Sequence, residues 1–359
     1  MENLFRGKSG RSLFVLLCLA AYLIGISPHL IHWFTAGSPP DALVWNMTHY
    51  HVSYPEYGFL RRGLLGTAMA PLLAPLTDGG GAEYAVMLGL DLGLMLVLIW
   101  LAMRFFLRED GVPGQGWILA ALILSPVGFV QLGYDAGRLD HVNFVLAAIA
   151  VLCALRGWSI AAGALMLVAV LVHEAALFYA VPVVTVLAWR IRFRLRDAWF
   201  AAVPPLAAAL ALVIWGGTEA DLSATLPEEV ALAASVWTRD LLEPARGFPP
   251  VHYLIAAYFA AVPLFLLWTH YRLARTRPDL LFLAPFAALA LFALGVDYGR
   301  WTQLVFFAVL LVIAAGPPLG RARGMDLDPL PARAVILPWL LPLGPIGIAV
   351  LYPFIPWVV

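Results

Sequence analysis

The sequence predicts an all-α, polytopic integral membrane protein with about ten to eleven transmembrane helices. Hydrophobic residues make up 62% of the chain and charged residues 12%, whereas soluble domains hold about 45–50% apolar and about 25% charged residues. The mean hydropathy is +0.87, and apolar runs long enough for membrane helices follow one another along the chain. These runs lack the period-two alternation of a membrane β-barrel, so we expect helices.

The first apolar run covers residues 12–34 and follows the basic start MENLFRGKSGR. It is longer than the apolar core of a signal peptide, which is about 7–15 residues, so we expect an uncleaved first helix. The same reasoning predicts further spans, in order, at 84–107, 117–134, 141–155, 159–172, 175–189, 198–216, 251–269, 280–296, 301–316 and 335–356.

The basic residues orient these helices, because Lys and Arg collect on the cytoplasmic side of a membrane. With the N-terminus inside, all but six of the Lys and Arg residues fall on that side. The six on the outer side are Arg61, Arg62, Arg138, Arg239, Arg246 and Arg300. The sequence therefore predicts a multi-pass protein of the inner (cytoplasmic) membrane, with a cytoplasmic N-terminus.

Residues 159–189 are apolar except for His173 and Glu174. A single helix of this length would be roughly 46 Å long, well beyond a hydrocarbon core of about 30 Å. It would also place the basic block 190–197 on the outer side. We therefore expect two short helices that meet near His173 and Glu174, with this pair at the outer tip of a hairpin.

We expect the whole chain, 1–359, to form a single transmembrane domain, and its first outer loop, 35–83, is unusually long. The part of this loop from Leu60 to Leu76 is apolar but interrupted by proline, and it begins at two arginines. A crossing here would invert every later helix and the distribution of arginines. We therefore predict a re-entrant or interfacial helix.

Two further segments interrupt the predicted spans. The second outer loop, 217–250, contains a stretch at about 226–243 that can form an amphipathic helix on the outer surface. The segment 317–334 is rich in proline and glycine and predicts a linker on the inner side. The sequence shows no soluble domain.

Charge and motifs exclude several function classes. The net charge is zero and the isoelectric point about 7.1, so there is no basic face for nucleic acid. Cys18 and Cys153 both lie in apolar runs and are expected to be small core residues. His173 and Glu174 begin a zinc-binding HExxH pattern, but position 177 is leucine, so the pattern fails. No serine-nucleophile elbow and no Walker loop occur, and we predict no cofactor and no metal ligands, although a divalent metal stays open.

The pattern Asp-x-Gly-Arg occurs twice at the end of an apolar run, in GYDAGRLDH (133–141) and in GVDYGRW (295–301). The predicted orientation places both copies on the outer face, beside YPEYGFLRRG (54–63) and the His173-Glu174 pair. The outer polar set consists of Glu56, Arg61, Arg62, Asp135, Arg138, Asp140, His141, His173, Glu174, Asp297 and Arg300. Ionisable residues at membrane depth are costly and usually face a cavity, so this set predicts a functional site.

Simpler interpretations stay open for each part of this set. The two Asp-x-Gly-Arg patterns can be local ion pairs at helix ends, with glycine permitting the turn. Arg61 and Arg62 can be interfacial anchors. His173 and Glu174 can orient each other, and Asp91, in the middle of an apolar run, can be a hydrogen-bonded residue of the bundle or a proton relay.

The many spans, the long first outer loop and the outward arginines resemble the polytopic membrane glycosyltransferases. These are the GT-C type, which uses polyprenyl-phosphate sugars, and the Wzy-type polymerases of O-antigen and exopolysaccharide. The resemblance implies transfer of a sugar from a lipid-linked saccharide at the outer face of the cytoplasmic membrane. It also implies a catalytic carboxylate in the first outer loop, which would be Glu56 or Asp41.

The resemblance and the outer polar set together assign roles to the candidate residues. Four arginines would bind the donor phosphate: Arg61, Arg62, Arg138 and Arg300. The acceptor hydroxyl would lose its proton to Glu56, Asp135 or Asp140, and His173 and Glu174 would orient the acceptor or act as the alternative base. Asp297 completes the catalytic candidates, and His141 the binding candidates. Outer aromatic residues could stack on sugar rings or form an interfacial belt: Tyr54, Tyr57, Tyr134, Tyr298 and Trp301.

Two other function classes compete with this one. A secondary transporter or flippase for a polar or lipid-linked solute would also hold a polar cluster within a helix bundle. Its site would lie near the midplane, whereas the polar residues here crowd one face. A non-catalytic assembly protein would need the Asp-x-Gly-Arg patterns for stability alone. The expected partners are a lipid-linked saccharide and membrane lipids, and the sequence leaves the oligomeric state open.

Overall fold

The computed structural model is helical, and no strand occurs in the residues it describes. These residues are 8–76, 81–106, 123, 126–216, 250–273, 276–294 and 298–315. The chain divides into two compact units, each described here by itself. Unit 1 comprises Met1–Pro28, Ile99–Tyr134 and Leu242–Val359, and unit 2 comprises His29–Leu98 and Asp135–Leu241.

Three helices of the described part are long and apolar enough to cross a membrane. They are α1 (Lys8–Ala36), α5 (Ala82–Phe106) and α12 (Leu195–Trp215). Large apolar side chains of α12 are exposed, among them Trp199, Leu210 and Val213. An exposed apolar face on a helix of this length is what a lipid-facing helix presents, so the prediction of a helical membrane protein is confirmed at this level.

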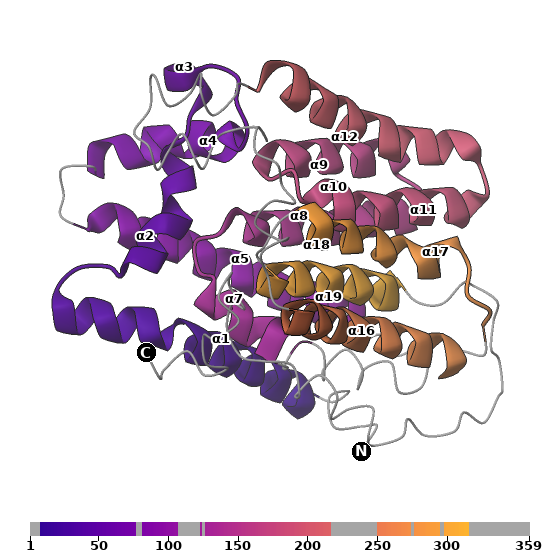
Figure 1. The fold of residues 1–359 in the computed structure, drawn as a ribbon, viewed down its shortest axis with the longest axis horizontal. Helices are drawn as coiled ribbons and strands as arrows, with labels where there is room; N and C mark the ends of the chain where they lie inside the picture. Colours follow the sequence, from indigo (N-terminus) through magenta and orange to yellow (C-terminus); the bar gives the residue numbers. More distant parts are fainter. Residues whose placement is uncertain are drawn as a thin grey trace. The chain divides into compact units, whose positions relative to one another are not determined.

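Helices α8 to α12 pack together within unit 2 (Figure 1). Helix α9 (Ser159–Val172) packs against α8 (Leu139–Leu155) and α12, and α11 (Val181–Arg192) packs against α12 and α8. A Cβ atom on Gly163 of α9 would lie 2.0 Å from the carbonyl oxygen of Phe200. Glycine therefore allows α9 and α12 to approach closely.

The predicted break near His173 and Glu174 is confirmed. Helix α9 ends at Val172, and the next turn, α10 (Ala176–Tyr179), begins after Ala175. The backbone of His173 is extended, and its carbonyl oxygen accepts a hydrogen bond from Nδ2 of Asn143 at 2.9 Å. The extended residue ends the helix, and the buried amide fixes the break against α8.

Short helices precede α5 in unit 2. They are α2 (Asp41–Thr48), η1 (His49–His51), α3 (Tyr54–Tyr57), α4 (Gly63–Leu73) and η2 (Ala74–Leu76). A Cβ atom on Gly66 would lie 1.9 Å from the carbonyl oxygen of Val52, so glycine lets α4 lie against the chain that follows η1. Helix α4 thus lies in the segment from Leu60 to Leu76, where we predicted a helix. Its interfacial or re-entrant position in a membrane stays a prediction.

In unit 1, α16 (Pro250–Leu273) packs against α19 (Tyr298–Ala315), as Figure 1 shows. The predicted span 280–296 is not one regular helix: it is divided into α17 (Leu280–Leu283), the 3₁₀ segment η4 (Ala284–Ala290) and α18 (Leu291–Leu294). Asp279 caps α17, because its carboxylate accepts hydrogen bonds from the backbone N–H of Leu281 and Phe282 at 3.1 Å each. Pro285, which lacks a backbone N–H, stands at the start of η4.

Only the end of the predicted span 117–134 is described throughout, as η3 (Pro126–Val130) and α7 (Gln131–Tyr134). A Cβ atom on Gly133 would lie 2.0 Å from the carbonyl oxygen of Tyr22, which shows how closely this segment approaches α1. The predicted amphipathic helix at 226–243, the linker 317–334 and the span 335–356 lie outside the described residues.

Candidate functional site

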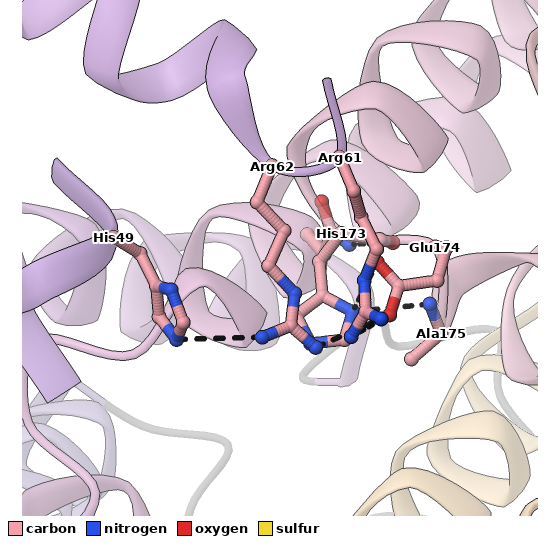
Figure 2. Close-up of polar contacts among 7 residues, drawn as sticks. His49, Arg61, Arg62, His173, Glu174 and Ala175 are labelled. Atoms are coloured by element: carbon pink, nitrogen blue, oxygen red, sulfur yellow. Dashed lines mark hydrogen bonds and ion pairs between the residues drawn. The ribbon is translucent and has the colours of Figure 1, made fainter. Parts of the chain in front are cut away.

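Arg61 and Arg62 lie in the turn that leads into α4. Arg62 is the residue before this helix, and its backbone is left-handed, with φ +65°. A non-glycine residue rarely adopts this conformation, which costs on the order of 1–3 kcal/mol and is often found at functional sites. The turn directs both side chains toward the break between α9 and α10 (Figure 2).

Both guanidinium groups meet the same carboxylate oxygen. Nη2 of Arg61 lies 2.8 Å and Nη2 of Arg62 lies 3.2 Å from Oε1 of Glu174 (Figure 2). The three side chains are between 11% and 17% exposed, so water screens them only in part. The two guanidinium groups therefore share one carboxylate oxygen as a hydrogen-bond and charge partner.

Two histidines border the arginine pair. Nη1 of Arg62 lies 3.5 Å from Nε2 of His49, and because arginine only donates, this nitrogen is the acceptor and the ring proton sits on Nδ1. The backbone N–H of Ala175 donates to Nδ1 of His173 at 3.0 Å, so His173 carries its proton on Nε2. His49 and His173 therefore add hydrogen-bonding atoms beside the arginine pair.

Glu174 is held in its ionised form. Burial by itself would raise the pKa of this carboxyl group, but the charges of Arg61 and Arg62 hold the pKa well below its usual value. A carboxylate of this kind is a weak proton acceptor at neutral pH. This favours Glu174 as the residue that orients the arginines, rather than as the base.

The first Asp-x-Gly-Arg pattern forms a turn at the start of α8. Nε of Arg138 lies 3.1 Å from Oδ1 of Asp135, whose side chain is 2% exposed. Gly137 has φ +83°, which a side chain would disfavour. Nδ2 of Asn46 donates to the carbonyl oxygen of Ala136 at 3.2 Å and so ties α2 to this turn. The local ion pair that we left open as the simpler interpretation is therefore present.

A second buried pair joins α5 to α8. Nδ1 of His141 lies 2.5 Å from Oδ1 of Asp91, and neither side chain is exposed. Asp140, the residue before His141, is also buried. Asp91 is therefore a hydrogen-bonded residue of the bundle, one of the two roles that the sequence left open.

The structure does not bring the carboxylates of the first loop to the arginine pair. Glu56 of α3 and Asp41 of α2 are both exposed, and Glu56 forms a hydrogen bond with Tyr57. Tyr54 packs its ring 5.4 Å from that of Phe59. A Cβ atom on Gly63 would touch the Tyr54 ring, which gives this tyrosine a packing role in the turn.

The second Asp-x-Gly-Arg pattern belongs to unit 1 and is described in part. Asp297 lies outside the described residues, and Tyr298 is the first residue of α19. The guanidinium carbon of Arg300 lies 5.3 Å from the centre of the Trp301 ring, which is a cation–π distance. Trp301 thus packs with Arg300 within unit 1.

Three buried polar residues were not predicted from the sequence: His49 beside Arg62, Asn46 at the turn before α8, and Asn143 at the break after α9. All three side chains are buried. Asn143 gave a usable signal, because it is a polar residue inside the apolar run of α8. His49 and Asn46 gave none, because nothing in the first loop indicates which of its polar residues turn inward. Among the described residues, no group of three or more His, Cys, Asp or Glu residues could hold a metal ion.

Comparison with models of protein families finds no match for this chain. Comparisons with curated proteins and with solved structures find no match either.

Proposed function

We propose that this protein is a membrane glycosyltransferase or polymerase that uses a polyprenyl-(pyro)phosphate-linked sugar. One observation carries the proposal: two adjacent guanidinium groups, Arg61 and Arg62, converge on one oxygen of Glu174. Arginine presents a planar fork of donors that matches phosphate oxygens. A partly buried pair of forks suits a phosphate group that is fixed at a membrane.

The proposed reaction forms and breaks one bond each at the sugar. The acceptor oxygen bonds to the anomeric carbon, and the bond from this carbon to the donor phosphate breaks, with its electron pair staying on the phosphate. Negative charge therefore grows where Arg61 and Arg62 supply donors, and oriented donors of this kind stabilise the transition state. Glu174 keeps the forks oriented before the donor binds.

The acceptor side of the site would draw on the turn before α8. Asp135 and Asp140 are buried and lie in unit 2, as do Arg61 and Arg62. Arg138 holds Asp135 at 3.1 Å and is itself partly exposed. These groups suit a sugar, which presents several hydroxyl groups as donors and acceptors.

The proposal includes more membrane spans than the three long helices and a defined orientation in the membrane. We propose about ten to eleven spans, with the N-terminus in the cytoplasm and the arginine pair toward the outer face of the cytoplasmic membrane. The helix α4 would then lie at the membrane surface or re-enter it. Lipid-linked sugars with long polyprenyl chains stay in the bilayer, so a site at this depth can reach their phosphate groups.

The lipid-linked saccharide profile of the host tests the proposal. In a strain that lacks the gene, we compare the wild-type chain with the Arg61→Ala/Arg62→Ala double variant at matched membrane protein levels. Arg196→Ala is the control, because Arg196 is exposed and predicted on the opposite side. We expect the double variant alone to accumulate a polyprenyl-linked intermediate and to lose or shorten the finished glycan. An unchanged profile would contradict the proposal and favour a transporter.

A further inference from the structure

His141 and Asp91 form a buried pair that the arginine chemistry does not use. Nδ1 of His141 lies 2.5 Å from Oδ1 of Asp91, and both side chains are 0% exposed. An ionised carboxylate only accepts hydrogen bonds, so Nδ1 is the donor. The pair joins the candidate span α5 to the first turn of α8.

The second ring nitrogen of His141, Nε2, indicates a role in chemistry. Since Nδ1 donates to Asp91, Nε2 of the neutral ring is an acceptor. Nε2 is buried and has no hydrogen-bond partner within the part of the chain that is described. A buried polar atom without a partner is costly, so this nitrogen calls for a hydrogen-bonding group that the described part of the chain does not supply. A hydroxyl group of a ligand can donate a hydrogen bond to this nitrogen of a neutral imidazole.

Acidic groups surround the imidazole. Asp91 contacts it directly, and Asp135 and Asp140 lie close enough to act on its charge. Tyr50, which is 1% exposed, lies near Asp91. Negative charge around a histidine stabilises the imidazolium form. These carboxylates lie where they can interact with the positive charge that the ring would gain on accepting a proton.

We propose that His141 is the general base of the transfer reaction and that Asp91 is its positioning residue. This inference rests on the proposed function. The acceptor hydroxyl binds at Nε2 and gives its proton to that nitrogen while its oxygen bonds to the anomeric carbon. The bond from this carbon to the phosphate breaks, and the electron pair stays on the phosphate held by Arg61 and Arg62. Asp91 fixes the tautomer and stabilises the imidazolium that forms.

This assignment replaces the expected carboxylate base in the first outer loop, Glu56 or Asp41. Glu56 and Asp41 are exposed, and Glu174 is committed to the arginines. His141 has the fixed orientation that a general base needs, with Nδ1 held by Asp91 and Nε2 making no hydrogen bond within the described residues. The acceptor would enter beside Arg138, whose side chain is 20% exposed at the start of α8.

Turnover as a function of pH tests the inference. The probe is the polyprenyl-linked intermediate that accumulates in the gene-deletion strain. Vesicles of that strain are fused with liposomes that carry the purified protein, and consumption of the intermediate is followed by mass spectrometry from pH 5 to pH 9. The wild-type rate should rise with pH, because only the neutral imidazole accepts a proton. His141→Gln should lower the rate by about 100-fold or more and abolish this rise.

Two further variants separate chemistry from folding. Asp91→Asn should lower the rate and move the rising limb to lower pH, because the carboxylate no longer favours the imidazolium; a purely structural role would leave the limb in place. His32→Gln is the matched control, since His32 is exposed, and it should match the wild type. Binding of undecaprenyl phosphate should be the same for His141→Gln and the wild type, which shows that the variant is folded.

The outcomes distinguish this inference from the proposal on which it rests. If Arg62→Ala abolishes consumption while His141→Gln keeps the wild-type rate and pH profile, the role of His141 is wrong and the proposed function stands. If Arg62→Ala also leaves consumption unchanged, the proposed function is wrong and the role of His141 is overturned with it.

Discussion

Arg62 and Glu174 are 112 residues apart in the sequence, and Nη2 of the arginine donates to Oε1 of the glutamate at 3.2 Å. Arg61 reaches the same oxygen at 2.8 Å. Glu174 lies at the break between α9 and α10, so these contacts tie the turn before α4 to the helical hairpin of unit 2. The same contacts orient two guanidinium groups, and they therefore serve both the fold and the proposed chemistry.

Replacing Glu174 should change how stability depends on pH. The pKa of Glu174 in the folded protein is held below its usual value of 4.5. Its ionised form therefore adds stability that is complete above about pH 4.5 and is lost as the pH falls through the lower, folded-state pKa. Thermal unfolding from pH 7 to pH 3 should show Glu174→Gln less stable than the wild type at pH 7. The difference should shrink toward pH 3, and a constant difference would contradict the ion-pair account.

The guanidinium fork, rather than charge alone, should matter at position 62. Arg62→Lys keeps the charge but loses the planar donors that reach Glu174 and His49 together. We expect about a 10-fold or greater loss of turnover of the accumulated lipid-linked intermediate, since a charge-assisted hydrogen bond contributes about 1.5–3 kcal/mol. The exposed Arg196→Lys should have no effect. Wild-type turnover in Arg62→Lys would show that a point charge is sufficient.

The packing of α4 against the preceding chain should depend on Gly66. A Cβ atom at this position would lie 1.9 Å from the carbonyl oxygen of Val52, whereas a Cβ atom on Gly89 of α5 meets nothing within 4 Å. Gly66→Ala should lower the free energy of unfolding by about 1–3 kcal/mol. Gly89→Ala should be neutral or stabilising by about 0.5–1 kcal/mol, because alanine favours helix. Thermal unfolding measures both, and equal midpoints would show that α4 does not pack as described.

The proposed topology predicts opposite accessibility for two exposed positions. Asp41 and Arg196 are both exposed. Asp41 is predicted on the outer side of the membrane and Arg196 on the cytoplasmic side. A membrane-impermeant thiol reagent should label Asp41→Cys in intact cells and Arg196→Cys only after permeabilisation. The native Cys18 and Cys153 are buried and should give a low background. The reverse labelling pattern would invert the orientation and place the arginine pair on the cytoplasmic side.

Patterns of hydropathy predicted an all-helical membrane protein and one break between helices, but not the contacts among polar residues. The length limit on a membrane helix predicted the break at His173 and Glu174, because one helix could not hold the whole apolar run. The pairing of Glu174 with Arg61 and Arg62 could not be predicted, since it depends on how the turn before α4 folds back. The partnership of Asp91 with His141 was hidden for the same reason: two helices must first be packed together.

The carboxylates show the limit of the sequence most clearly. Glu56 was a candidate base because the resemblance implies a catalytic carboxylate in the first outer loop, but its side chain is exposed on α3. Asp140 and His141 are neighbours in the sequence, and neighbouring side chains on a helix point in different directions. Both are nevertheless buried. Burial and partners therefore decide which ionisable groups can share a site, and neither can be read from spacing alone.

Binding of undecaprenyl phosphate to the purified protein tests the central claim most directly, namely that Arg61 and Arg62 hold a lipid-linked phosphate. The titration compares undecaprenyl phosphate with undecaprenol, which has the same chain without the phosphate, in nanodiscs with the wild type, Arg61→Ala/Arg62→Ala and Arg196→Ala. We predict that the wild type and Arg196→Ala bind only the phosphate-bearing lipid and that the double variant binds it at least about 10-fold more weakly, as expected when charge-assisted hydrogen bonds are lost. Equal binding of the two lipids, or unchanged affinity in the double variant, would contradict the claim.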